Sequence, residues 1–442
     1  ESNTLAAANA LYDVWTWERY GHILFAQGDC ASDDAEVGGD VSITDDQSAA
    51  QDIMLYKALS GNIYVSNFAK LCYTGIQRCN TLLSETDPET NDLSYNPSRY
   101  RGEASFLRAV FYFYLVNTMG PVPLITKPVT DDMFTTGNRT EGDNEKGTKQ
   151  MEAIYNQIVT DLEYAAANLP PYSQEKTGRA TKAAAYGYLI KAYSTMASSK
   201  YIFSDKKDYW QKVITYSDKI RSEDPRNLET DYHKLFTVQG ENCSESLFEI
   251  QFVTSSNYGP KGEGSEHSID FSPRGVFELS GGYGYGLNSP TIDLVKQFDI
   301  NTGASIINWK DEWVLTPTNI PLDSTTGTKY TAYLKNLIKK VPSLMKDYVD
   351  YDPRLDLIAK PGDSLFNIDK NMWYHIKAFK GTSDKYFSAT GFWGMKTCSA
   401  LIDHSDQYNQ LNKKLLRYSD VLLLEAEARF NTGDEEGAKS IV

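Results

Sequence analysis

Apolar residues recur at helical spacing through the N-terminal part of the chain. In residues 149–168, for example, Ile154, Ile158 and Leu162 lie on one stripe, and the sequence Leu-Pro-Pro follows it. Consecutive helices of this kind favour helical pairs, although no regular period of about 34 residues is evident. The pattern predicts helices over residues 5–20, 50–60, 63–84, 102–119, 149–168 and 180–198.

The helix expected at 102–119 is apolar around most of its circumference. Phe106, Val110 and either Phe113 or Tyr114 form one row, and Leu107, Phe111 and Leu115 form an overlapping one. Gly-Pro-Val-Pro at 120–123 ends the helix, because proline lacks an amide donor and disfavours helical geometry in the preceding residue. A helix with this pattern must be covered by neighbours on all sides.

The pattern changes after about residue 201. One more helix is predicted around residues 209–220, then a buried strand at 246–253 and a helix at 289–298, which Ser289 caps and Pro290 begins. Residues 255–288 form a long glycine-rich and aromatic stretch, and 301–394 are irregular. Helix returns at 415–430, and another begins before Val442. The prediction is therefore a mainly α protein with a few short strands.

Six segments in the first and second halves resemble blocks of the SusD/RagB family, in the family's order. The most specific is GEASFLRAVFYFYLVNTMGPVPLI (102–125). The others are YTGIQRCN (73–80), IYNQIVTDLEYAAANLP (154–170), GRATKAAAYGYLIKAYSTMA (178–197), and the late pair YDPRL (351–355) and LLRYSDVLLLEAEARFNTGD (415–434). This resemblance implies a single SusD-like domain over 1–442. It would have tetratricopeptide-like helical pairs in about 1–220, an insertion-rich half in about 221–414 and returning helices in 415–442.

Composition and charge exclude several classes of partner. The net charge of −15 and a pI near 4.9 argue against nucleic acid, which requires a basic face. They also argue against unaided binding to anionic lipid. Aromatic residues make up 12% of the chain, with 30 tyrosines, and most are expected to pack in the core. An acidic, tyrosine-rich surface fits a neutral polar ligand such as a sugar.

The sequence contains no stretch of the ~20 apolar residues that a transmembrane helix needs, and no signal peptide begins it. The resemblance implies a lipidated cysteine upstream, and a chain that is incomplete at both ends. The five cysteines are too few and scattered for a disulfide framework. Cys72 and Cys79 fall on one helical face, where buried thiols acting as small hydrophobes are expected.

No catalytic or cofactor motif is recognisable. The sequence lacks a phosphate loop, a GxSxG elbow, an HExxH helix and a CxxC pair, and no two of its five histidines lie within four residues of each other. Each histidine is expected on the surface or in a polar core rather than on a metal. Asp33-Asp34 and Asp45-Asp46 could suggest calcium, but they do not match the DxDxDG pattern, so a solvated acidic loop is expected. We therefore expect no enzyme activity, metal or cofactor.

Aromatic loops are the remaining candidates for a binding site. Sugars stack on phenol and indole rings while their hydroxyls bond to carboxylates and amides. Tyr283 and Tyr285 lie among glycines that let a ligand approach, and Trp309 and Trp313 would share a face on a helical turn. For both pairs, packing on the helical core is an equally good interpretation.

The resemblance implies that glycan binds to one face formed by early polar loops and the aromatic insertion. Transferred by position, the ligand-binding residues are Asp33, Asp34, Tyr95, Tyr283, Tyr285, Trp309 and Trp313. It also implies a cell-surface, lipid-anchored outer-membrane protein that delivers an oligosaccharide to a SusC-like TonB-dependent transporter. Two alternatives remain: a peptide or other nutrient as cargo, and a glycoside hydrolase on a helical scaffold.

Overall fold

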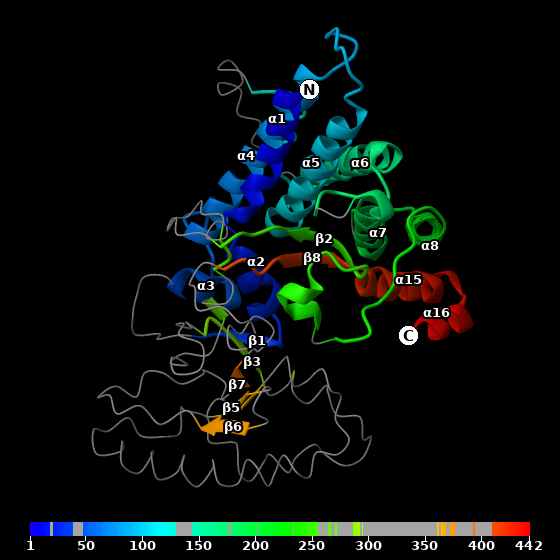
Figure 1. The fold of residues 1–442 in the computed structure, drawn as a ribbon. Helices are drawn as coiled ribbons and strands as arrows, with labels where there is room; N and C mark the ends of the chain where they lie inside the picture. Colours follow the sequence, from blue (N-terminus) through cyan, green and yellow to red (C-terminus); the bar gives the residue numbers. More distant parts are fainter. Residues whose placement is uncertain are drawn as a thin grey trace.

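The structure is a computed structural model, and Figure 1 shows its fold. It describes residues 1–17, 21–38, 47–129, 144–175, 178–200, 202–232, 234–254 and 409–442. It also describes the short segments 264–266, 270–271, 286–291, 294, 360–361, 364–367, 372–375 and 392–393. Among the described helices, none combines the length and apolar character that crossing a membrane requires.

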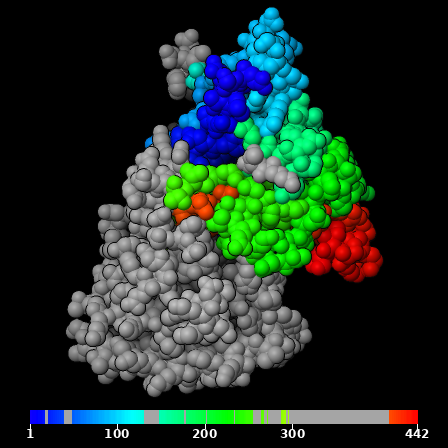
Figure 2. Space-filling model, in the orientation of Figure 1, coloured from blue at the N-terminus to red at the C-terminus, as the bar shows by residue number. Residues whose placement is uncertain are grey.

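Helices dominate the described part of the chain, as predicted, and neighbours in sequence pack side by side (Figure 1). The long helices are α1 (Ser2–Asp13), α3 (Gln47–Met54), α4 (Ile63–Glu85), α5 (Ser98–Met119), α6 (Asn144–Asn168), α7 (Lys182–Ser198), α8 (Lys206–Glu223), α15 (Tyr418–Thr432) and α16 (Glu435–Ile441). From α4 to α8 each helix packs on the next, and α15 returns from the end of the chain to pack on α8 and α7. Figure 2 shows the C-terminal helices in red at one edge, beside the green residues of α8 and its successors.

Helix α5 is the centre of this stack, and its buried residues occupy every side of the helix, as its sequence predicts. Phe106 meets Tyr188 of α7 and Phe248 edge to face, with ring centroids 5.6 and 4.9 Å apart. On another side Phe111 stacks on Trp15, with centroids 4.7 Å apart and planes within 4°. The helix ends at Gly120, whose φ of 75° favours glycine, and the segment after it is held by the Tyr112 hydroxyl, which donates to the Ile125 carbonyl at 3.0 Å.

Four two-stranded antiparallel sheets complete the described fold. Strand β1 (Ala35–Val37) pairs with β3 (Asn288–Pro290), and β2 (Ser246–Ile250) pairs with β8 (Lys413–Arg417). The second pairing joins the end of the chain to its middle, and β2 is buried along its whole length. The remaining strands are β4 (Lys360–Pro361) with β7 (Phe392–Trp393) and β5 (Ser364–Asn367) with β6 (Met372–His375).

Two predicted helices are wrong at their starts. Residues 288–290 form β3 and not a helix, because Glu36 and its neighbours on β1 pair with Ser289 and its neighbours. Proline is tolerated in a short two-stranded pairing of this kind, so the helix signal is overridden by tertiary contact. Leu415 and Leu416 likewise belong to β8, and α15 begins only at Tyr418, where Asp420 accepts from the Arg417 amide at 3.0 Å.

Other helix boundaries differ by a few residues. The helix predicted at 5–20 begins at Ser2 and gives way to a 3-10 turn, η1 (Val14–Thr16), and the one predicted at 50–60 ends at Met54. The helix predicted at 63–84 is confirmed, and Asn62 caps it by accepting from the amides of Tyr64 and Val65. Cys72 and Cys79 are fully buried on α4, as predicted, and burial raises the pKa of both thiols.

Candidate functional site

Asp33 and Asp34 lie on an exposed turn that a distorted helix prepares. Helix α2 (Ile23–Phe25) runs into a π-helical turn, η3 (Ala26–Cys30), and the chain then reverses before β1. The Ser32 hydroxyl donates to the Asp29 carbonyl at 2.7 Å, and the Asp34 amide donates to the Ser32 hydroxyl at 3.2 Å. Local side-chain bonds of this kind favour turns over helix, so both carboxylates remain at the surface.

This turn is hydrogen-bonded to the segment that directly follows Tyr285 in the sequence. The Thr291 amide donates to the Asp34 carbonyl at 2.8 Å, and the Thr291 hydroxyl donates to the Asp33 carbonyl. Within the same segment, the Asn288 side-chain amide donates to the Asp29 carboxylate at 2.6 Å. The pairing of β1 with β3 therefore holds the first acidic loop against the end of the glycine-rich stretch.

Two glycines make this approach possible. A Cβ on Gly38 would lie 1.8 Å from the Gly286 carbonyl oxygen, so a side chain there would force the two strands apart. Gly286 has φ of 61°, in the left-handed region that favours glycine. The Gly38 amide donates to the Leu287 carbonyl at 3.0 Å across the same junction. The backbone contact fixes the position of residue 286, next to the tyrosine pair in sequence.

Tyr283, Tyr285, Trp309 and Trp313 lie outside the described residues. Their role as sugar platforms therefore stays a prediction.

Tyr95 lies at the opposite end of the helical stack from the acidic turn. Its hydroxyl bonds to the Thr4 hydroxyl near the start of α1, and its ring meets Tyr100 edge to face at 6.4 Å. This loop follows the C-terminal end of α4, a helix about 35 Å long, whereas the acidic turn lies beyond its N-terminal end (Figure 1). The structure therefore does not bring Tyr95 together with Asp33 and Asp34.

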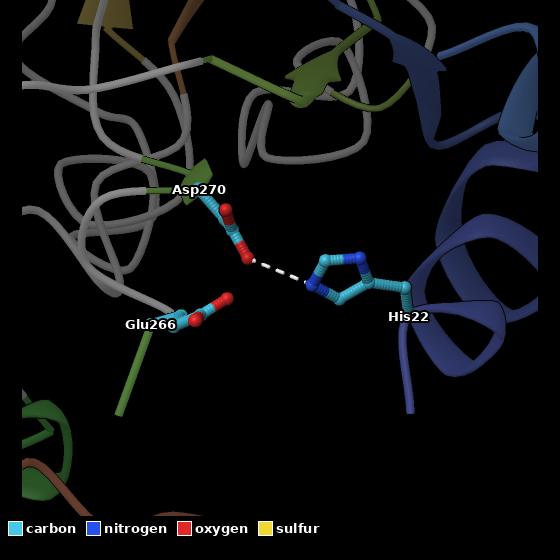
Figure 3. A group of neighbouring side chains, drawn as sticks. All are labelled: His22, Glu266 and Asp270. Atoms are coloured by element: carbon cyan, nitrogen blue, oxygen red, sulfur yellow. Dashed lines mark hydrogen bonds and ion pairs between the residues drawn. The ribbon is translucent and has the colours of Figure 1, made fainter. Parts of the chain in front are cut away.

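A buried group of three side chains, which the sequence did not reveal, lies at the start of α2. His22 Nε2 is 3.0 Å from an Asp270 carboxylate oxygen, and Glu266 lies beside them (Figure 3). One nitrogen or oxygen atom of each residue lies within 4.8 Å of the others. Glu266 and Asp270 are both buried, and only 17% of the His22 side chain is exposed. No local motif could have predicted the group, because His22 and Asp270 are 248 residues apart.

Backbone hydrogen bonds connect this group to the same junction. The Asp270 amide donates to the Glu266 carbonyl at 2.9 Å, and the Asp270 carbonyl accepts from the Leu287 amide at 2.8 Å. Leu287 in turn accepts from Gly38. Residues 264–266, 270–271 and 286–291 thus reach the N-terminal loop through one continuous set of contacts.

The described pockets of the helical half offer little for hydrolysis. One, of about 610 Å³, lies between α5, α6, α7 and α15, and Glu427 is the single carboxylate among its described lining residues. Another, of about 350 Å³, is lined by Asp13 and Glu249, which form ion pairs with Arg78 at 2.8 Å and Lys414 at 3.2 Å. Glycoside hydrolysis requires two cooperating carboxylates at one sugar. Neither pocket therefore offers two carboxylates that are both available to a sugar.

The buried thiol beside the acidic turn is also unsuited to catalysis. Burial raises the pKa of Cys30, and the carboxylates of Asp29 and Glu36 raise it further. A nucleophilic cysteine needs the opposite shift, toward the thiolate.

Comparison with known families agrees with the sequence resemblance. A model of the "SusD family" matches residues 244–442. A second model, described as "Starch-binding associating with outer membrane", matches residues 12–193. Together the two models account for most of the chain.

Curated relatives are similar over about half of the chain. A SusD-like protein of Bacteroides ovatus is 27% identical over 236 residues, which are 52% of this chain and 39% of that protein. SusD-like protein P2 of Formosa agariphila is 28% identical over 242 residues, 54% of this chain and 44% of that protein. The matched regions thus cover less than half the length of each of these curated relatives.

Solved structures share the fold over the whole chain. A laminarin binding SusD-like protein superposes with a TM-score of 0.67 at 20% identity, covering 100% of this chain and 82% of the other. Surface glycan-binding protein A of Bacteroides thetaiotaomicron, in complex with laminarihexaose, gives 0.65 at 20% identity, covering 100% and 81%. The predicted mainly helical, SusD-like fold is confirmed, and the chain belongs to the SusD/RagB family.

Proposed function

We propose that the chain binds an oligosaccharide or polysaccharide at the cell surface, without hydrolysing it, for uptake across the outer membrane. It belongs to a family of non-catalytic binding proteins, and two proteins of the same fold bind laminarin or laminarihexaose. The observation that carries the proposal is the junction between the acidic turn and residues 286–291, because it joins polar groups to the end of the tyrosine-rich stretch. A sugar needs both kinds of group at one place.

The proposed contacts are Asp33 and Asp34 with the aromatic pairs Tyr283, Tyr285 and Trp309, Trp313. Tyr95 is left out, because its loop lies at the far end of α4. The carboxylates would accept bonds from sugar hydroxyls while the rings cover the apolar faces of the sugar. A surface site leaves much of such a ligand in water, so we expect modest affinity.

The test is calorimetry or affinity electrophoresis against laminarin and a panel of host and plant polysaccharides. Tyr283→Ala and Trp309→Ala should each weaken binding about 10-fold, which corresponds to ~1.4 kcal/mol for one aromatic contact. Tyr95→Ala is the matched control, since it removes a tyrosine ring away from the junction and should leave affinity unchanged. Binding that survives both aromatic variants but is lost in the control would contradict the proposed site.

Two further outcomes would change the proposed class. Sustained release of reducing ends from a polysaccharide would indicate a hydrolase. An array without any bound glycan, together with peptide retained by the chain, would indicate a different nutrient.

We also propose that the chain works with a SusC-like TonB-dependent transporter and is held at the outer membrane by an N-terminal lipid anchor. Support comes from the family description, which includes association with the outer membrane. The test is affinity purification of the lipidated protein from outer membranes in mild detergent. A TonB-dependent transporter in stoichiometric amount is expected, and its repeated absence would overturn the partnership.

A further inference from the structure

We propose that His22, Glu266 and Asp270 bind a divalent transition-metal ion, for which zinc is the best fit. His22 comes from the N-terminal segment and the two carboxylates from residues 266 and 270, and the three side chains converge at the start of α2 (Figure 3). The ion would hold residues 264–266 and 270–271 against the N-terminal segment that leads into η3. This site is separate from glycan binding, and its test does not depend on a sugar.

The geometry already approaches that of a zinc site. Ligand atoms on a tetrahedral zinc ion, with bonds of ~2.0–2.1 Å, lie about 3.3 Å from one another. The candidate ligand atoms here are all within 4.8 Å of one another, and His22 Nε2 and Asp270 Oδ2 are 3.0 Å apart. Small rotations of the carboxylates would therefore suffice, and the ion would replace the present hydrogen bond between His22 and Asp270.

The donor set selects the type of ion. Calcium takes six to eight oxygen ligands and magnesium keeps an octahedral shell of oxygens, whereas one imidazole with two carboxylates suits zinc and its neighbours. Three protein ligands leave one tetrahedral position, which water can fill.

Burial and charge support the same conclusion. Glu266 and Asp270 are each only 5% exposed. Two carboxylates brought together away from water repel each other, and a divalent cation bound between them would relieve this repulsion. The imidazole is also oriented, because its ring meets the Tyr64 ring edge to face with centroids 5.5 Å apart.

The location gives the ion a structural role. Asp270 accepts from the Leu287 amide through its carbonyl, and Leu287 accepts from Gly38. A ligand bond to the Asp270 side chain would thus fix the residue whose carbonyl accepts from Leu287, directly before β3. Ordered outer contacts of this kind are typical of metal sites.

The test is zinc titration of chelator-treated protein by calorimetry, with the melting temperature measured in parallel. One zinc ion per chain should bind, and zinc should raise the melting temperature. His22→Ala should raise the dissociation constant for zinc at least ~100-fold. Loss of an outer-shell partner can already cost that much, and His22 is proposed as a direct ligand. The combined variant Glu266→Gln, Asp270→Asn should do the same, and it keeps shape and hydrogen-bonding capacity if His22→Ala fails to fold.

Two control variants distinguish the site from adventitious binding. Glu36→Gln removes an exposed carboxylate on β1 near the junction, and Cys243→Ser removes a partly exposed free thiol. Both should bind zinc as the parent does. No zinc binding, unchanged binding in the two cluster variants, or binding abolished by Cys243→Ser would each overturn the proposal. Glycan affinity measured on the same variants tests the proposed function separately.

Discussion

The helical stack and the acidic-turn junction are held together in different ways. In the stack, side chains from different helices meet in buried ionic and aromatic contacts, such as Arg108 with Asp161 at 2.6 Å. At the junction, backbone groups make most of the contacts, between strands of three residues each. Stability concentrated in side-chain packing leaves the loops free to vary in sequence while the scaffold stays constant.

Glu103 illustrates the stack. This fully buried carboxylate on α5 accepts hydrogen bonds from Arg179 at 2.5 Å and from Arg99 at 3.3 Å. It also accepts a hydrogen bond from the Tyr12 hydroxyl at 3.1 Å. Burial, together with the Glu103 charge, raises the pKa of Tyr12, which keeps the phenol protonated as a donor. One network therefore joins α1, α5 and the residues before α7.

The largest effect is expected where a buried pair in the stack is broken. Arg108→Met leaves Asp161 buried without its bidentate partner, which donates from Nε at 2.8 Å and from Nη2 at 2.6 Å. Breaking such a pair costs about 3–5 kcal/mol. Urea unfolding followed by circular dichroism measures the loss.

Two controls make this prediction specific. Arg108→Met with Asp161→Leu should recover most of the stability, because no uncompensated charge remains. Lys439→Ala removes a pair between Lys439 and Glu436 that is exposed on α16, and should cost less than ~1 kcal/mol. Equal losses at the buried and the exposed pair would refute the distinction between the two kinds of contact.

A smaller loss is expected from crowding two helices of the stack. A Cβ on Gly75 would lie 2.2 Å from the Phe111 ring, which is itself stacked on Trp15. Gly75→Ala should therefore cost ~1–3 kcal/mol by overpacking and should alter the near-ultraviolet signal of Trp15. Gly147→Ala on α6 is the control, since its Cβ would meet only Pro121 at 3.6 Å and alanine favours helix. A loss of the same size in both variants would argue against a crowding effect.

The sequence predicted the stack better than the loops for a physical reason. Helical spacing is local, so the extent of α4 and the complete burial of α5 could be read from it. The strand at 288–290 could not, because its pairing with β1 depends on residues about 250 positions away. A serine followed by proline is a helix-start signal that cannot report such a partner.

The candidate site divides in the same way. The acidic turn was recognisable from composition, and the structure confirms that Asp33 and Asp34 are exposed. The sequence wrongly suggested grouping Tyr95 with them, because it does not show that the two loops lie at opposite ends of α4. His22 could not be grouped with Glu266 and Asp270, since no spacing rule relates residues 248 positions apart.

Between the two regions, the polar contacts around β2 and β8 give a pH-dependent effect of about 1 kcal/mol. Burial raises the pKa of Glu241 to about 7, and the nearby Glu249 charge adds to the shift. The folded state therefore binds a proton that the unfolded state releases above its pKa of about 4.5, so stability falls as pH rises from about 4.5 to 7. Because Glu241 is partly exposed, solvent screening reduces the effect to the order of 1 kcal/mol.

Glu241→Gln should flatten this decline, since glutamine keeps an oxygen to accept from the Asn412 amide at 3.0 Å. Urea unfolding at pH 5 and pH 8 measures it: the variant should gain on the parent at pH 8 and match it at pH 5. If the difference in the free energy of unfolding between variant and parent is the same at both pH values, Glu241 is ionised in the folded state at both.

The smallest effect on global stability should come from the change that most disturbs the junction. Gly38→Ala places a methyl group 1.8 Å from the Gly286 carbonyl oxygen, so β1 and β3 must separate. Strand β1 packs mainly on β3, α3 and η3 rather than on the central helices α4 to α8, so we expect the free energy of unfolding of those helices to change by less than ~0.5 kcal/mol. Hydrogen exchange should instead quicken at the amides of Gly38 and Thr291, which bond across the junction. Gly28→Ala is the control, because its Cβ would meet nothing within 4 Å and exchange at those amides should not change.

A large fall in the global free energy of unfolding of Gly38→Ala would mean that the junction and the stack unfold as one unit. The contrast between a packed scaffold and a separately held binding surface would then fail.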